Sequence, residues 1–181
     1  MFLKPHPVAF ALKKHVEDEL VRLEKNGVIT KVENCEWGTP LAPVMRADGK
    51  FRLCEDYNTT ANKILVHVNY PFPRVEEVYA AMQGGELFSR LDLRDAYNQL
   101  ELGDDTKRLL AWSTHKGIFV PNRLPYGTKP ACAIFQKHME KVLLGIPGVK
   151  VLIDDITVTE KKLKNIYATY GKFLIAQNER I

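Results

Sequence analysis

The chain has 181 residues, which is enough for one substantial hydrophobic core or for one domain with a smaller lobe. Its composition, 45% hydrophobic and 27% charged, is typical of a globular protein, and its net charge of +4 permits a polyanionic partner without requiring one. Three scattered cysteines argue against a disulfide framework or a zinc site, and no apolar run reaches the roughly 18 residues that a membrane span needs.

Residues 1–70 are predicted to form a β-rich lobe behind an amphipathic helix. The apolar face of that helix repeats at helical spacing through Leu12, Val16, Leu20 and Leu23. Residues 41–45 and 51–54 flank a glycine-containing turn, which predicts a β-hairpin. Lys50 and Arg52 lie near its tip, where they are either solvated turn charges or the arm that grips a triphosphate.

Residues 71–181 are predicted to form a second domain in which helices and strands alternate. The expected elements are a helix over residues 74–82, a strand carrying Asp92, one or two helical turns over 93–100, a hairpin over 109–120, a helix over 130–144, a hairpin around Asp154 and Asp155, and a helix over 161–176. This order is typical of an α+β layer with helices on one face of an antiparallel sheet.

Asp154 and Asp155 interrupt a β-branched stretch, which predicts a tight hairpin with the aspartates at its tip. Aspartate is common in turns because its side chain bonds local N–H groups, and this is the simpler interpretation of the pair alone. Asp92, near the end of another short apolar strand, allows a second one. A small sheet would bring the three carboxylates together, and they would repel one another unless a divalent cation lay between them. Mg²⁺ prefers such oxygen ligands, so we expect a two-metal phosphoryl-transfer site.

Four motifs occur in a fixed order along the chain. They are Gly49-Lys50-Phe51-Arg52-Leu53-Cys54 with Asp56-Tyr57, then Phe88-Ser89-Arg90-Leu91-Asp92-Leu93-Arg94-Asp95-Ala96-Tyr97, then Arg123-Leu124-Pro125-Tyr126-Gly127 with Phe135-Gln136, then Leu152-Ile153-Asp154-Asp155. Together they resemble the reverse transcriptase of gypsy-type LTR retrotransposons, over about residues 8–158. The resemblance implies reverse-transcriptase fingers over residues 1–70 and a palm with a ferredoxin-like antiparallel sheet over 71–181.

The resemblance also implies roles for individual residues. Asp92, Asp154 and Asp155 would be the catalytic carboxylates and would hold two Mg²⁺ ions, or Mn²⁺ in their place, with the Leu93 carbonyl as an extra oxygen. Deoxynucleotide binding would involve Lys50 and Arg52 at the triphosphate, Tyr97 as the steric gate against a ribose 2′-hydroxyl, and Asp95, Tyr126 and Gly127 around the sugar and base. Tyr97 is also readily explained as an ordinary aromatic core residue.

The implied function is RNA-directed DNA polymerisation on an RNA or DNA template with a primer, using deoxynucleoside triphosphates. We expect an intracellular protein, cytoplasmic or nuclear, with no membrane partner. Leu152 stands where the family usually has Tyr, and the chain ends at Ile181 without room for a thumb. The sequence therefore leaves two alternatives, a catalytically inactive truncated remnant that at most binds nucleic acid, and another two-metal enzyme such as a nuclease.

Overall fold

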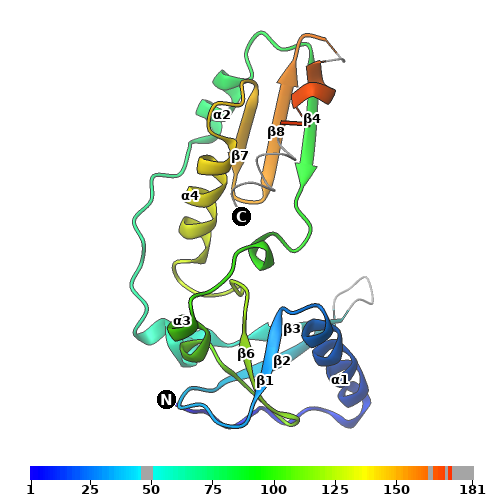
Figure 1. The fold of residues 1–181 in the computed structure, drawn as a ribbon, viewed down its shortest axis with the longest axis vertical. Coiled ribbons are helices and arrows are strands. Elements are labelled where there is room, and N and C mark those ends of the chain that lie inside the picture. The colour runs from blue at the N-terminus through cyan, green and yellow to red at the C-terminus, as the bar shows by residue number, and fades with distance from the viewer. Residues whose placement is uncertain (46–50, 163–164, 170, 173–181) are drawn as a thin grey trace. The chain divides into compact units, whose positions relative to one another are not determined.

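The computed structural model describes residues 1–45, 51–162, 165–169 and 171–172 (Figure 1). Contacts divide the chain into two compact units, each built from two segments of sequence. The first unit contains Met1–His67 and Tyr97–Ala131, and the second contains Val68–Ala96 and Cys132–Ile181.

The helices and strands agree with the predicted α+β class. They are α1 (Phe10–Lys25), β1 (Ile29–Val32), β2 (Thr39–Met45), β3 (Phe51–Glu55), the 3-10 helices η1 (Tyr57–Thr59) and η2 (Ala61–Lys63), α2 (Val75–Ala81), β4 (Leu87–Asp92), the 3-10 helix η3 (Ala96–Gln99), α3 (Asp104–Leu109), β5 (Trp112–Thr114), β6 (Gly117–Pro121), α4 (Ala131–Leu143), β7 (Val149–Leu152) and β8 (Asp155–Glu160). Residues 165–169 and 171–172 are also helical. None of the helices in the described residues has the length and apolarity needed to cross a membrane.

Helix α1 confirms the predicted amphipathic helix. Val16, Leu20 and Leu23 of its apolar face are buried. The helix ends where Gly27 adopts a φ of 69°, a left-handed conformation that glycine tolerates well. The N–H groups of Gly27 and Val28 then donate to the carbonyls of Glu24 and Leu23, so two otherwise unpaired C-terminal carbonyls are satisfied.

The first unit is built on a five-stranded sheet in the order β1-β6-β5-β2-β3. Its pairs are antiparallel except β2 with β5, where Thr39 lies opposite Trp112. Tyr57 lies fully buried in the core beside this sheet. Its hydroxyl donates to the carbonyl of Leu110 at 3.1 Å and accepts the indole N–H of Trp112 at 2.8 Å. Both polar groups of the buried aromatic pair are therefore satisfied.

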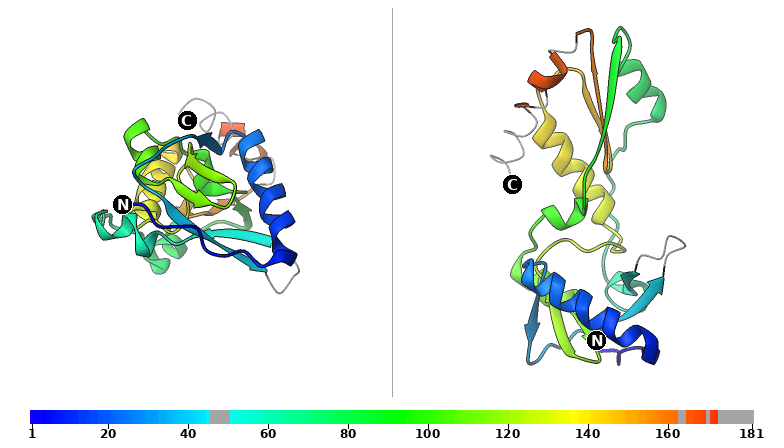
Figure 2. Two further views of the ribbon diagram at one scale, coloured as in Figure 1. Left: turned by 90° about the horizontal axis from the view of Figure 1, so that it is seen from below. Right: turned by 90° about the vertical axis from the view of Figure 1, so that its right-hand side faces the viewer.

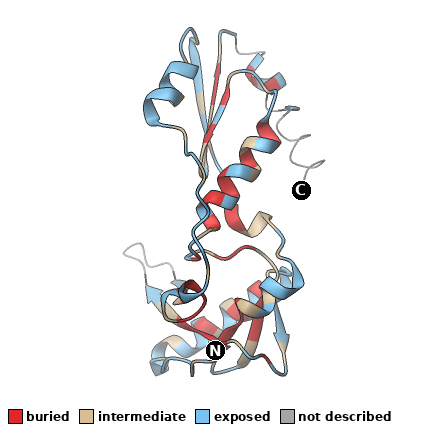
Figure 3. Ribbon diagram, turned by 90° about the vertical axis from the view of Figure 1, so that its left-hand side faces the viewer, coloured by how far each residue is buried: buried red, intermediate tan, exposed pale blue. Residues whose placement is uncertain are grey.

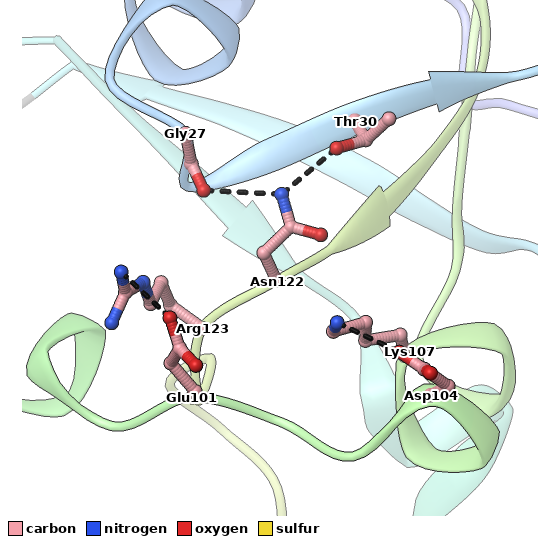
Figure 4. A network of polar contacts seen from close by, with 7 residues as sticks. All are labelled: Gly27, Thr30, Glu101, Asp104, Lys107, Asn122 and Arg123. Carbon is pink, nitrogen blue, oxygen red and sulfur yellow. Dashed lines mark hydrogen bonds and ion pairs between the residues drawn. The ribbon is translucent and has the colours of Figure 1, made fainter.

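Polar contacts tie the loops of the first unit to its strands (Figure 4). The Asn122 side-chain amide, just after β6, donates to the carbonyl of Gly27 at 3.1 Å and to the Thr30 hydroxyl at 2.8 Å. This fixes the turn between α1 and β1 against β6. Arg123 forms an ion pair with Glu101 at 3.1 Å, which joins the segment after β6 to the segment before α3.

Strand pairing explains why the units differ from the predicted boundary at residue 70. The segment over residues 97–131, predicted as part of the domain over 71–181, lies in the first unit because β6 pairs with β1 and β5 pairs with β2. A second difference is α3, since the sequence predicted a strand beginning at Leu109 where this residue ends a helix. Gly103 precedes α3, and Asp104 and Asp105 occupy its first turn, where negative charge is favourable.

The second unit is built on a three-stranded antiparallel sheet in the order β4-β8-β7. One face is apolar, with buried side chains at Val149, Val151, Ile156 and Val158. Helix α4 and the helical residues 165–169 lie on one side of the sheet (Figure 2, right). Buried residues run along α4, among them Phe135, Met139 and Val142 (Figure 3). The other sheet face carries mostly polar side chains, with Phe88 and Leu152 among them, so the alternation of the strands separates the core from a largely polar face.

Candidate active site

The predicted hairpin with its aspartates at the tip is present. Leu152 and Asp155 are Cα partners at the ends of β7 and β8, so Ile153 and Asp154 form a two-residue loop. Ile153 has a φ of 58°. Two-residue hairpin loops require a positive φ at their first residue, and a β-branched residue rarely adopts one. The Asp154 side chain is exposed at the turn, and Asp155 is half-buried at the start of β8.

Asp92 lies directly across the sheet from this turn. It is the last residue of β4, and its Cα partner on β8 is Asp155. Directly opposed residues of an antiparallel pair place their side chains on the same face, with Cβ atoms about 4.5–5.5 Å apart. The structure therefore brings the two predicted carboxylates Asp92 and Asp155 onto one sheet face, with Asp154 next in the chain.

Arg90 lies beside these carboxylates on β4, two residues before Asp92 and thus on the same face. Its Nε donates to Oδ1 of Asp155 at 2.8 Å, and its Nη2 donates to Oδ1 at 2.6 Å and to Oδ2 at 2.8 Å. Hydrogen bonding to Asp155 and the charges of Asp155, Asp92 and Asp154 raise the pKa of Arg90 above its ordinary value. One guanidinium therefore responds to all three carboxylates.

The donor chemistry fits the hard divalent cation that the sequence predicts, since carboxylate oxygens are its preferred ligands and Asp92 and Asp154 are exposed. Among the described residues, however, no group of three His, Cys, Asp or Glu side chains is arranged to hold a metal ion. Positive charge at these carboxylates comes from Arg90. The three aspartates are chemically suitable as metal ligands. In this structure both carboxylate oxygens of Asp155 are hydrogen-bonded to Arg90.

A buried glutamine on α4 anchors the hairpin turn. Gln136 is 0% exposed, and its Oε1 accepts the backbone N–H of Ile153 at 2.6 Å. Its Nε2 donates to the carbonyl of Val151 at 3.0 Å and to the Glu140 carboxylate at 2.7 Å. Glu140 also accepts the hydroxyl proton of Tyr70. In the sequence, Gln136 belongs to one of the family motifs, but no role was assigned to it. A glutamine on the apolar face of a predicted helix was the signal that could have identified it.

The residues predicted to bind deoxynucleotide lie partly in the first unit, where three of them stack in a row. The guanidinium carbon of Arg52, on β3, lies 5.1 Å from the ring centroid of Tyr126. The Tyr126 ring in turn packs against Tyr97, with centroids 4.7 Å apart and ring planes at 35°. Tyr97 is buried at 7% exposure, so it is a core aromatic as well as a candidate gate. Lys50 lies outside the described residues.

A second residue missed from the sequence holds the turn that follows this stack. Gly127 has a φ of 81° and its carbonyl accepts the side-chain amide of Asn62 at 2.8 Å. The Asn62 carbonyl oxygen accepts the backbone N–H of Lys129 at 2.9 Å, and Asn62 is 4% exposed. The Tyr126-Gly127 turn is therefore clamped from a 3-10 helix that lies far from it in sequence.

The other predicted site residues lie in the second unit. Leu93 is half-buried and Asp95 is exposed, both in the segment after β4. Asp95 has a φ of 49°, which aspartate tolerates better than most residues. The predicted site thus falls into two sets, with Arg52, Tyr97, Tyr126 and Gly127 in the first unit and Asp92, Leu93, Asp95, Asp154 and Asp155 in the second.

Comparison with known proteins gives a consistent result. The sequence pattern of the reverse transcriptase (RNA-dependent DNA polymerase) family matches residues 44–178. An uncharacterized protein from Caenorhabditis elegans is 34% identical over 182 residues, covering 96% of this chain and 14% of that protein. The retrovirus-related Pol polyprotein from transposon 297 of Drosophila melanogaster is 25% identical, covering 90% of this chain and 16% of the polyprotein. The chain thus spans only a small part of the curated relatives it matches.

Solved structures agree on the fold. The foamy viral protease-reverse transcriptase in complex with double-stranded DNA superimposes with a TM-score of 0.87 at 22% identity, covering 99% of this chain and 31% of that chain. The same viral protein in complex with an RNA/DNA hybrid gives a TM-score of 0.80 at 21% identity, covering 97% of this chain and 24% of that chain. With the family match extending over most of the described residues, the chain belongs to the reverse transcriptase family of retrotransposon and retroviral Pol polyproteins.

Proposed function

We propose that this chain is the fingers–palm part of an RNA-directed DNA polymerase from a gypsy-type LTR retrotransposon. It would add deoxynucleotides to a primer 3′-hydroxyl along an RNA or DNA template. The observation that carries this proposal is the pairing of Asp92 with Asp155 on the polar face of the β4-β8-β7 sheet, in a chain of this family. The order of the four sequence motifs supports the gypsy-type assignment.

The carboxylates Asp92, Asp154 and Asp155 would hold two Mg²⁺ ions, or Mn²⁺, with the Leu93 carbonyl as a further oxygen. Bound Mg²⁺ supplies Lewis acidity toward the triphosphate and lowers the pKa of a coordinated hydroxyl. The protein's own part would be to keep Asp92 and Asp155 on one sheet face, with Asp154 beside them in the turn. The register of β4 with β8 and the two-residue turn after β7 support this.

The row of Arg52, Tyr126 and Tyr97 would receive the incoming nucleotide. Arg52 is exposed and suited to bidentate contact with a phosphate, and Lys50 would supply a second positive charge to the triphosphate. The Tyr97 ring is held against Tyr126 and cannot easily turn aside, so it would exclude a ribose 2′-hydroxyl. Asp95 and Gly127 would contribute to the walls around the sugar and base.

Primer and template would be bound mainly through their phosphate backbones, while base pairing supplies the sequence information. The foamy viral reverse transcriptase solved with double-stranded DNA and with an RNA/DNA hybrid supports nucleic acid as the partner class. The net charge of +4 is compatible with it.

A second candidate is a nucleic-acid-binding domain without catalysis. The observation that favours it is the ion pair between Arg90 and Asp155, because the guanidinium occupies both oxygens of a carboxylate that polymerisation would require.

Primer extension distinguishes the two. The 181-residue chain is incubated with Mg²⁺, deoxynucleotides and a primer on an RNA template, beside Asp92→Asn and Asp155→Asn. We expect extension by the wild type and at least a hundredfold loss in both variants, with Asp18→Asn, an exposed position on α1, as the control. The Tm of Asp92→Asn should be equal or up to about 2 °C higher, because one of two opposed like charges is removed. Equal extension by Asp92→Asn contradicts the catalytic assignment. A folded wild type that binds primer–template without extending it supports the second candidate.

A further inference from the structure

Gln136 forms two hydrogen bonds to the aspartate hairpin, which packing of α4 alone would not need. It is 0% exposed, on the α4 face that also buries Phe135 and Met139. A buried amide must be bonded, and apolar side chains of similar length would fill the same space without that demand. We propose that Gln136 is a positioning residue that sets the conformation of the turn and thereby the placement of Asp154 and Asp155; its relevance to catalysis rests on the proposed function.

The side-chain amide of Gln136 contacts β7 in the way that the N–H and C=O of one residue in a parallel strand would. It donates to the carbonyl of Val151 and accepts from the N–H of Ile153, two residues further along. One residue of a parallel strand contacts its partner with this same spacing of two. The orientation of the amide is thereby fixed, since only the nitrogen donates and only the oxygen accepts. A carboxylate or an apolar side chain of similar size cannot reproduce both contacts.

The hydrogen bond to Ile153 is made at a residue with a strained backbone conformation. Ile153 has a φ of 58°, which its branched Cβ disfavours, and such a conformation persists only where the surroundings impose it. The next two residues are Asp154 and Asp155. If the Ile153 peptide relaxes, the turn that carries Asp154 and leads into Asp155 changes conformation, whereas Asp92 stays on β4.

A second layer orients Gln136 itself. Its remaining N–H donates to Glu140 at 2.7 Å, one helical turn later on α4. Glu140 accepts from the hydroxyl of Tyr70, in the segment between the first unit and α2. A chain of hydrogen bonds therefore runs from Tyr70 through Glu140 and Gln136 to the peptide of Ile153. All four residues belong to the second unit.

The direct test follows the Ile153 amide in isoleucine-¹⁵N-labelled protein, assigned with an Ile153→Val sample. Gln136→Met removes both contacts at nearly constant volume, and Gln136→Glu keeps the acceptor but removes the donors. Gln83→Met, at an exposed position, is the matched control. We expect hydrogen exchange at Ile153 to become at least tenfold faster in Gln136→Met and less so in Gln136→Glu, with unchanged exchange in the control. Unchanged exchange in a folded Gln136→Met protein overturns the proposal.

Binding of Mn²⁺ alone, followed by electron paramagnetic resonance, links the turn to the carboxylates. The affinity should fall at least fivefold in Gln136→Met and remain unchanged in Gln83→Met. An unchanged affinity in the Gln136 variant, with the wild type binding Mn²⁺, would mean that the turn does not place the aspartates. If the wild type itself shows no Mn²⁺ binding, hydrogen exchange at Ile153 decides alone.

Tyr70→Phe keeps the proposal testable if the Gln136 variants do not fold. It removes one hydroxyl from a half-buried ring at the far end of the hydrogen-bond chain. We expect two- to fivefold faster exchange at Ile153, and no change there would overturn the second layer. These measurements contain neither nucleic acid nor nucleotide. A wild type that fails in primer extension therefore rejects the proposed function while leaving the positioning role of Gln136 to be decided by exchange.

Discussion

Arg90 holds Asp155 through three hydrogen bonds of 2.6–2.8 Å, on the sheet face that also carries Asp92. The side chains are 72% and 40% exposed, so the pair contributes little to stability. Its importance is electrostatic, because Asp92 and Asp154 also act on the same guanidinium. Arg90 therefore offsets part of the negative charge of the three carboxylates, and any divalent ion at Asp155 has to compete with it.

Arg90→Gln should therefore increase the affinity for a divalent ion. Removing one positive charge about 5 Å from a divalent ion in an aqueous environment changes binding by roughly 1–2 kcal/mol, or about five- to thirtyfold in Kd. Titration with Mn²⁺ at low and high ionic strength measures this, and the difference should shrink in high salt. Arg22→Gln on α1 changes the net charge equally and serves as the control. Equal affinities in wild type and Arg90→Gln would show that the guanidinium does not compete.

The register that makes this contact was predictable only in part. Short apolar segments next to Asp92 and to Asp154-Asp155 indicate that the carboxylates share a sheet, because a carboxylate in a buried strand has to be paired, neutral or bound to a metal. The sequence does not indicate that Arg90 turns toward Asp155, since the side chains of one sheet face have several partners within reach. Local electrostatics decides the rotamer of a side chain on an exposed face, and the pattern of residue types along the sequence does not predict it.

Asn62 should be required for the Tyr126-Gly127 turn. Its buried amide bonds the Gly127 carbonyl and the Lys129 N–H, and Asn62→Ala removes both hydrogen bonds, each of which contributes roughly 0.5–1.5 kcal/mol. Asn62→Ala should therefore lower the free energy of unfolding by about 1–3 kcal/mol. Urea denaturation measures this, with Asn58→Ala as control because Asn58 is exposed and bonds the same amide. If Asn62→Ala lowers the free energy of unfolding no more than the control does, the Tyr126-Gly127 turn does not depend on Asn62.

Tyr97→Ala should admit ribonucleotides, because the ring packed 4.7 Å from Tyr126 would no longer fill the space beside the sugar. The same change leaves a cavity in the core, so the stability should fall by about 3–5 kcal/mol. Tyr97→Phe keeps the ring and should retain the preference for deoxynucleotides. Incorporation of each nucleotide type is compared in primer extension, at a temperature where circular dichroism shows the variants folded. An unchanged preference in Tyr97→Ala would leave Tyr97 as a core residue alone.

Local patterns predicted the helices and hairpins well, and they failed where distant segments meet. Gln136 and Asn62 act through partners 15–67 residues away, on other elements, so no spacing rule identifies them. The hairpin of β5 and β6 was expected from its turn, yet its place in the sheet of the first unit depends on pairing with β1 and β2. Short-range signals define elements, whereas tertiary pairing decides which residues become neighbours.

Glu55 should make the protein less stable as the pH rises. Burial raises the pKa of its carboxyl from 4.5 to about 7, against the opposing effects of its own backbone N–H and of Arg52. The folded state therefore binds the proton more tightly than the unfolded state. Its stabilising contribution is complete below pH 4.5 and is lost as the pH rises toward 7. The full loss is at most about 3 kcal/mol, because Glu55 remains partly exposed.

Glu55→Gln isolates this effect, because the amide is neutral at every pH and nearly the same size. Urea denaturation between pH 4.5 and 8 should show the wild type losing stability relative to Glu55→Gln, with the difference levelling off above the pKa of about 7. Glu24→Gln, at an exposed position on α1, should follow the wild type across the range. Parallel pH profiles for wild type and Glu55→Gln would mean that the carboxyl at the end of β3 ionises as readily in the folded chain as in the unfolded one. Since Glu55 follows Arg52 on the same strand, its ionisation would also add a negative charge near the residue proposed to hold the triphosphate.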